Sequence, residues 1–198
     1  MKKTKATFFI LPGFGQQASS QGYRWLIKFL ETKGFKIFAV PVKWKYRTNT
    51  DVANDFIEFY NKHKSGTNYV LGFSYGAVVA LMTANELKPN KIYLCSLSPD
   101  FKEDTVKMKP WVQRLIGKKR LVDTQKRSGK KLASELEVPS AVFYGEEEAQ
   151  DYPQLKIRCE ETVKLANKSK LVIVKLAPHK IDHPNYVEAI KEEINSLL

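Results

Sequence analysis

The chain has 198 residues, 43% of them hydrophobic and 27% charged, a balance typical of a folded globular protein rather than a disordered or fibrous one. This length favours a single domain, residues 1–198. Thirty-three Lys and Arg against 21 Asp and Glu give a formal net charge of +12, so an anionic partner is one function class to weigh.

Targeting signals are not apparent. The apolar run Phe8 to Leu11 near the start of the chain is too short for a signal peptide, and no stretch approaches the roughly 20 apolar residues that span a bilayer. We therefore expect a soluble, cytoplasmic protein with no membrane span. The two cysteines, Cys95 and Cys159, form neither a disulfide framework nor a metal-ligand spacing, so we expect reduced thiols and no metal.

Short apolar runs rich in β-branched and aromatic residues predict six strands. In chain order they are Thr7 to Leu11, Lys36 to Val40, Tyr69 to Phe73, Lys91 to Cys95, Ser140 to Tyr144 and Leu171 to Leu176. Segments of helical period alternate with them: Gln21 to Lys33, Thr50 to His63, Tyr75 to Leu87, Thr124 to Glu135, Tyr152 to Asn167 and Asn185 to Leu197. This alternation predicts an α/β fold with three layers, α/β/α, around a mostly parallel sheet of about six strands.

The interval 96–139 interrupts this alternation. It predicts either a small basic lid or insertion, or a crossover with irregular surface structure. Within it, Lys102 to Lys131 hold eleven basic residues and only three acidic ones. We interpret the run as a solvated surface; an anionic partner is the alternative, and nucleic acid is the less favoured form of it.

The first motif that indicates catalysis lies where the predicted third strand meets the predicted third helix. Gly72-Phe73-Ser74-Tyr75-Gly76 has the G-x-S-x-G pattern of a nucleophile elbow. In this turn a strained backbone exposes the serine hydroxyl, and the two glycines let strand and helix approach each other closely. The pattern predicts Ser74 as a nucleophile, with an N-cap serine as the alternative.

A serine nucleophile needs a base, and in this fold the chain order is serine, acid, histidine. His179 and His183 both follow the last strand. His179 lies in the loop and is the preferred base, whereas His183 precedes Pro184 and is expected to help start the last helix.

The acid is expected after the fifth strand. Glu148 follows Gly145 by three residues and is preferred as the carboxylate that orients the imidazole. Asp151 is the second candidate, and Asp100, which follows the fourth strand, is the third.

The loop after the first strand allows two interpretations. Leu11-Pro-Gly-Phe-Gly15 can supply a second oxyanion-hole donor, with the backbone N–H groups of Phe14 and Tyr75 as the expected pair. Gly13, Gly15 and Ala18 also match the G-x-G-x-x-A dinucleotide fingerprint. No carboxylate follows the second strand to bind a ribose hydroxyl, but Lys43 and Lys45 suit a 2′-phosphate, so an NADP-binding protein remains an alternative.

Taken together, these motifs resemble the α/β-hydrolase superfamily, in particular its small cytosolic esterase-like members, over nearly the whole chain. The sequence departs from that family in three ways: the two strands that usually open the sheet are not expected here, Pro12 stands where a histidine is common, and Glu148 stands where Asp is usual. The resemblance implies a minimal α/β-hydrolase fold.

The resulting expectation is a serine hydrolase that cleaves a carboxylic ester, thioester or amide of a small acyl substrate through an acyl-enzyme, without a cofactor. A non-catalytic or anion-binding protein on a hydrolase scaffold is the alternative. The sequence does not indicate an oligomeric state.

Overall fold

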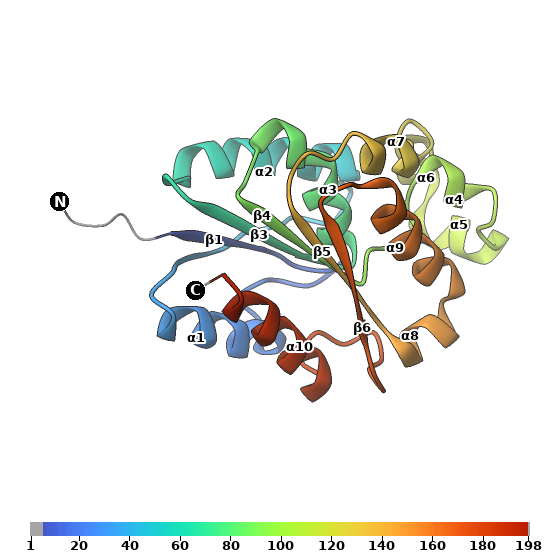
Figure 1. Ribbon diagram of the computed structural model, residues 1–198. Coiled ribbons are helices and arrows are strands. Elements are labelled where there is room, and N and C mark those ends of the chain that lie inside the picture. The colour runs from blue at the N-terminus through green and yellow to red at the C-terminus, as the bar shows by residue number, and fades with distance from the viewer. Residues whose placement is uncertain (1–5, 198) are drawn as a thin grey trace.

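The structure is a computed structural model that describes residues 6–197. The described residues form a six-stranded sheet in the order β2-β1-β3-β4-β5-β6, and every neighbouring pair is parallel (Figure 1). The strands are β1 (Thr7–Leu11), β2 (Lys36–Ala39), β3 (Asn68–Phe73), β4 (Lys91–Cys95), β5 (Ser140–Gly145) and β6 (Ser169–Val174). The expected fold class is therefore confirmed, with a wholly parallel sheet among the described strands.

Helices cover both faces of the sheet, which gives the three layers visible in Figure 1. One face carries the short 3₁₀ turn η1 (Gln21–Tyr23), α1 (Arg24–Thr32) and α10 (Pro184–Asn195). The opposite face carries α2 (Asn49–His63), α3 (Tyr75–Leu87), α7 (Gly129–Ser134) and α9 (Pro153–Leu165), with the short α8 (Glu146–Asp151) at the end of β5. None of the helices in residues 6–197 has the length and apolar character needed to cross a bilayer.

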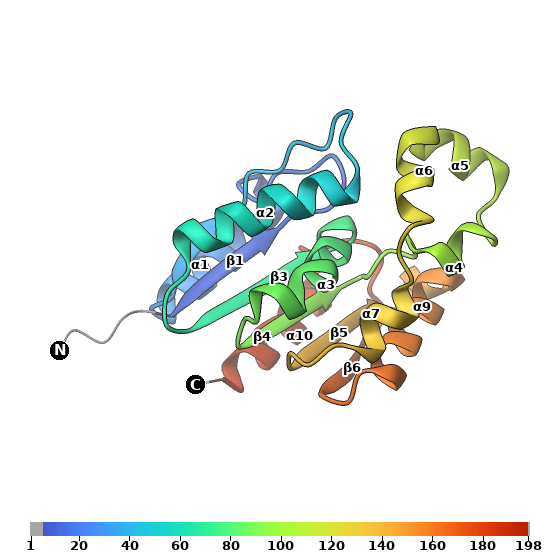
Figure 2. The ribbon, with the colours of Figure 1, turned by 90° about the horizontal axis from the view of Figure 1, so that it is seen from above.

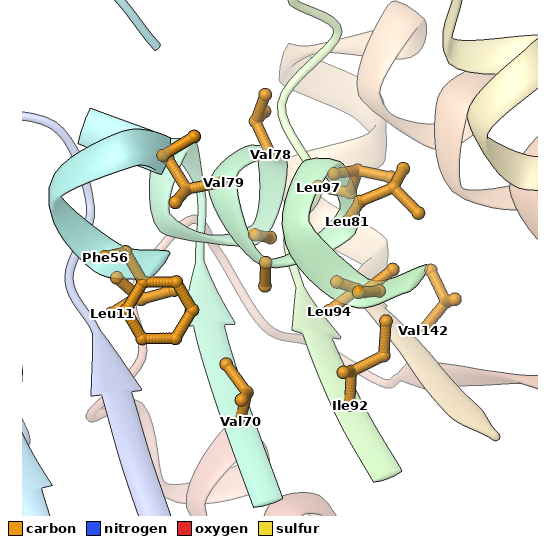
Figure 3. Close-up of a cluster of buried hydrophobic side chains, with 14 of the residues drawn as sticks. Leu11, Phe56, Val70, Val78, Val79, Leu81, Ile92, Leu94, Leu97 and Val142 are labelled. Carbon is orange, nitrogen blue, oxygen red and sulfur yellow. The ribbon is translucent and has the colours of Figure 1, made fainter. Parts of the chain in front are cut away.

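Two cores result from the pleat of the buried strands. Along β1, Phe8 and Ile10 face α1 and α10, while Phe9 and Leu11 face α2 and α3, as expected when successive side chains point to opposite faces. Figure 3 shows part of the core between the sheet and helices α2 and α3, where Leu11 of β1 and Phe56 of α2 meet near the start of α3. The central strands are buried on both faces, so they carry apolar side chains at successive positions instead of alternating apolar and polar ones.

The strand order places a switch point between β1 and β3. The chain leaves β1 toward β2 and then returns to β3 on the other side of β1. In open α/β sheets such a point opens a crevice at the carboxyl ends of the strands, where ligands bind. The loop after β1 and the turn after β3 therefore lie next to each other at that edge.

Residues 96–139 form four short helices between β4 and β5: α4 (Lys102–Thr105), α5 (Pro110–Ile116), α6 (Lys118–Thr124) and α7. Figure 2 shows α5 and α6 standing at one end of the molecule, beside the sheet layers. The expected continuous helix from Thr124 to Glu135 is wrong. The chain turns instead, because the Ser128 hydroxyl accepts a hydrogen bond from Lys131 N (3.1 Å) and caps a new helix.

Candidate active site

Ser74 occupies the turn between β3 and α3 in a rarely populated backbone conformation, with φ 55° and ψ −118°. Such a conformation costs about 1–3 kcal/mol in a residue with a side chain, and the surrounding contacts hold it in place. Ser74 N donates to Cys95 O (2.8 Å), which ties the turn to β4. The turn holds the Ser74 hydroxyl at the carboxyl edge of the sheet.

The two glycines of the turn are required by close packing. A Cβ on Gly72 would lie 2.3 Å from Gly76 O, and a Cβ on Gly76 would lie 2.3 Å from Leu11 O. Both obstacles are backbone atoms, which cannot rotate away. The strand-turn-helix contact that presents Ser74 is therefore possible only with glycine at both positions.

His179 lies in the loop between β6 and α10. Its Nε2 is 3.2 Å from Ser74 Oγ, within reach for a proton transfer once substrate tightens the site. The ring packs against Phe73, with centroids 4.9 Å apart. The loop after β6 thus brings the imidazole over the elbow.

Glu148 meets His179 from the other side. Its Oε1 pairs with His179 Nδ1, while its Oε2 accepts hydrogen bonds from Gly145 N (2.9 Å) and from Ser96 Oγ (3.0 Å). The Glu148 side chain is fully buried, so its carboxylate is shielded from water, whereas the His179 side chain keeps 34% of its surface exposed. Three partners fix the carboxylate in a single orientation toward the imidazole.

A tight backbone contact aligns the acid turn with the histidine loop. Glu148 N donates to Ala177 O (3.2 Å). A Cβ on Gly145 would lie 2.0 Å from the same Ala177 O, so glycine at this position allows the two segments to touch. The close approach sets the short distance between Glu148 and His179.

The other candidates lie elsewhere. Asp151 ends α8 and is exposed. His183 is the N-cap residue of α10, and its backbone O accepts from Val187 N (2.9 Å), as expected for a helix start. Within residues 6–197, none of the hydrogen bonds of His179 involves Asp151 or Asp100, so the structure brings only Glu148 to the imidazole.

Asp100 is buried and plays a different part. Asn49 Nδ2 donates to its Oδ2, and Thr124 Oγ1 donates to its Oδ1 (3.1 Å). Burial raises the pKa of Asp100 to about 6, although these hydrogen bonds and the nearby Arg127 oppose the rise. The carboxyl thereby links α2 and α6 to the segment that follows β4.

Sequence reasoning missed two residues behind the acid. Ser96, fully buried with φ 53°, contacts both Glu148 Oε2 and Tyr186 OH, the latter at 2.8 Å. Burial raises the pKa of Tyr186 well above its ordinary value, so its hydroxyl stays protonated. A signal existed: Ser96 directly follows β4, at the same sheet edge as the elbow.

Hydrogen bonds to the Tyr23 hydroxyl fix the loop that follows β1. Gly13 N donates to Tyr23 OH (2.9 Å), and Tyr23 OH donates to Gln16 Oε1 (2.6 Å). The next residue, Phe14, is 46% exposed, and its ring lies 5.3 Å from the Tyr75 ring. The Phe14 ring thus lies beside Tyr75, the residue that follows Ser74, and the role of the two backbone N–H groups as an oxyanion hole stays a prediction.

Residues 96–139 reach this loop through Arg120 of α6. The Arg120 guanidinium lies 4.3 Å from the centre of the Phe14 ring, a cation–π distance. It also donates to Arg47 O (2.8 Å) and to Trp44 O. Arg120 therefore fastens α6 over Phe14, so part of the basic run is structural rather than solvated.

The dinucleotide alternative lacks its structural context. The fingerprint requires a helix that opens at the glycine loop, so that its N-terminus meets the pyrophosphate. Here η1 begins only at Gln21 and α1 at Arg24, and the Gly13 N–H already donates to Tyr23. The geometry of Gly13, Gly15 and Ala18 does not favour an NADP site.

Comparison with known proteins gives a fold but no close relative. No family model matches the chain, and no curated protein matches it. Among solved structures, Est1E from Butyrivibrio proteoclasticus is 14% identical with a TM-score of 0.78, over 98% of this chain and 86% of that one. Alpha/beta hydrolase domain-containing protein 10 from mouse is 11% identical with a TM-score of 0.77, over 98% and 90%.

A third similar structure is MenH from S. aureus, 15% identical with a TM-score of 0.73, over 99% of this chain and 94% of that one. The chain therefore has the α/β-hydrolase fold. Since one fold hosts many activities, the function has to be argued from the site itself.

Proposed function

We propose that the protein is a serine hydrolase that cleaves a carboxylic ester, or a related thioester or amide, of a small acyl substrate. The observation that carries this proposal is the continuous chain of contacts from Ser74 Oγ through His179 to Glu148. Each residue has the side chain that its position in a Ser-His-acid triad requires. The strained elbow at Ser74 supports the same assignment.

In this mechanism Ser74 Oγ attacks the acyl carbonyl carbon while its proton moves to His179 Nε2. The C=O π bond opens to give an oxyanion. When the carbonyl re-forms, the bond between the acyl carbon and the leaving group breaks, and the leaving group takes the proton from His179. Glu148 keeps the Nδ1 proton of His179 in place and stabilises the imidazolium. Water repeats the sequence and releases the acid, so the chemistry needs no metal or cofactor.

The oxyanion is assigned to the backbone N–H groups of Tyr75 and Phe14. Tyr75 is the first residue of α3, a helix of 13 residues, so its N–H is one of the amides that point out of the helix N-terminus. The positive end of the helix dipole lies at the same place and favours the developing negative charge. Phe14 contributes from the loop that Tyr23 and Arg120 hold.

The substrate class is proposed from the rim of the site. Two exposed aromatic side chains flank the triad: Phe14 beside Tyr75, and Tyr152, which is 56% exposed and lies 6.2 Å from the His179 ring. Such rings favour an apolar or aromatic acyl group. A structure of the similar Est1E was solved with ferulic acid bound, which supports including aryl esters among the first substrates tested.

A panel of p-nitrophenyl esters with short, long and aromatic acyl groups tests the proposal. Loss of the nucleophile should reduce turnover by a factor on the order of 10⁵–10⁶, so Ser74→Ala should show only background hydrolysis. Ser140→Ala is the matched control, because Ser140 is buried at the opposite end of the sheet. Equal turnover by wild type and Ser74→Ala would contradict the proposal, and no turnover by either would favour a non-catalytic binding protein.

A further inference from the structure

A second serine lies against the proposed nucleophile. Ser98 Oγ is 3.1 Å from Ser74 Oγ, and both hydroxyls are buried. Ser98 follows β4 by three residues, at the carboxyl edge of the sheet. Within residues 6–197, Ser74 Oγ is its one side-chain hydrogen-bond partner, so the only contact of this kind that the structure gives the hydroxyl is with a reacting atom.

The backbone around Ser98 is held rigidly. Asp100 N donates to Ser98 O (2.9 Å) across Pro99, whose ring fixes its own φ. Asp100 is in turn held by Asn49 and by Thr124. The backbone that carries Ser98 is thus tied to α2 and α6 through Asp100, and its position does not depend on the elbow alone.

The direction of the hydrogen bonds follows from the chemistry. A serine hydroxyl carries one proton and two acceptor lone pairs. For His179 to act as a base, Ser74 must donate its proton to Nε2, which leaves its lone pairs as acceptors. Ser98 then has to be the donor in the Ser98–Ser74 contact.

We propose that Ser98 is a fourth catalytic residue, whose hydroxyl donates a hydrogen bond to Ser74 Oγ and so directs the Ser74 proton to His179. The proposal rests on the serine-hydrolase function proposed above. It adds a residue that neither the elbow motif nor the triad contains.

During attack, Ser98 keeps its own proton. Charge builds on Ser74 Oγ as its proton leaves for His179 and before the bond to the acyl carbon is complete, and the Ser98 donor stabilises that charge. Once the ester bond has formed, Ser74 Oγ is a weaker acceptor and the Ser98 hydroxyl is released. Ser98 thus acts on the formation of the tetrahedral intermediate, and no bond to Ser98 is made or broken.

The test measures the second-order rate constant for reaction of Ser74 with a small alkyl fluorophosphonate across pH 5.5 to 9. A hydrogen bond to a charged group contributes about 1.5–3 kcal/mol, so Ser98→Ala should react about 10- to 100-fold more slowly than wild type. The plateau should fall while the midpoint of the pH profile, which reports ionisation of the base, stays unchanged. Ser98→Thr keeps the hydroxyl and should remain within about threefold of wild type.

Melting temperature and the Ser140→Ala control separate this role from a structural one. If Ser98→Ala does not fold, Ser98→Cys makes the same test, because a thiol of similar size is only a weak donor. A wild-type rate in Ser98→Ala, or in Ser98→Cys, would overturn the proposal. An equal loss in Ser98→Thr and Ser98→Ala would also overturn it, by showing that volume matters and the hydroxyl does not. Failure of wild type to react at all would instead refute the serine-hydrolase proposal.

Discussion

Replacing Glu148 by glutamine changes the hydrogen-bond direction at the base without changing the size of the side chain. Both donors to Glu148 Oε2, Gly145 N and Ser96 Oγ, stay in place. In the Glu148→Gln variant the amide oxygen must face these donors, because an NH₂ group there would oppose the Gly145 N–H. The amide NH₂ is then turned toward His179 Nδ1.

This orientation forces the wrong histidine tautomer. His179 Nδ1 would have to accept from the amide, so the ring proton would move to Nε2, the atom 3.2 Å from Ser74 Oγ. A protonated Nε2 cannot take the serine proton. The corresponding change in a serine protease lowers kcat about 10⁴-fold, which corresponds to about 5.4 kcal/mol of lost transition-state stabilisation.

The assay is kcat/KM on the most active p-nitrophenyl ester, measured for wild type, Glu148→Gln, Asp151→Asn and Asp100→Asn. We expect a loss on the order of 10⁴-fold for Glu148→Gln and much smaller losses for the other two, since neither side chain hydrogen-bonds to His179. A Glu148→Gln enzyme that retains a tenth or more of wild-type activity would refute the tautomer argument. A larger loss in Asp151→Asn than in Glu148→Gln would show that Asp151 is the carboxylate that orients His179.

Two further predictions concern stability. Asp100 has a folded-state pKa of about 6, above the ordinary 3.8, so its contribution of about 3 kcal/mol is present below pH 4 and lost as pH rises through 6. Urea unfolding at pH 4.5 and 7.5 should show about 2 kcal/mol of this loss in wild type beyond the pH dependence of Asp100→Asn, and identical pH dependence in both would contradict the assignment. Gly76→Ala places a Cβ 2.3 Å from Leu11 O and should cost at least about 2 kcal/mol, lowering the melting temperature by about 4–8 °C. Gly66→Ala meets no atom within 4 Å and is the control; equal melting of the two variants would contradict the packing argument.

The sequence predicts features that depend on neighbours along the chain. The elbow around Ser74 is specified by glycines two residues away on each side, and Glu148 is defined by its distance from Gly145. Both patterns are local, so the strand ends and the turn can be recognised without the fold. The sequence prefers Glu148 to Asp151 and Asp100 by its distance from Gly145. In the structure Glu148 pairs with His179 beside the close contact between Gly145 and Ala177 O, which joins segments far apart in the chain.

The residues that the sequence did not indicate act across long distances in the chain. Ser98 meets Ser74 over 24 positions, and Ser96 meets Tyr186 over 90. Arg120 belongs to the run that the sequence predicts as a solvated basic surface, although its guanidinium lies over the Phe14 ring. No local sequence pattern marks these serines or this arginine, because each acts on a residue that only the fold brings next to it.

The wrong prediction of a continuous helix from Thr124 to Glu135 also has a physical reason. Its apolar spacing is compatible with one continuous helix, but Ser128 satisfies the first N–H groups of α7 better as a cap. Capping of this kind competes with helix propagation and is decided by the local backbone.

The most direct test of the central claim is whether Ser74 is the nucleophile. Folded wild-type protein is treated with a fluorophosphonate, and the modified residue is located by peptide mass spectrometry. Our account predicts one adduct per chain, on Ser74, with none on Ser74→Ala and none on Ser98 in either protein. The absence of an adduct from folded wild type, or an adduct on another serine, would contradict it.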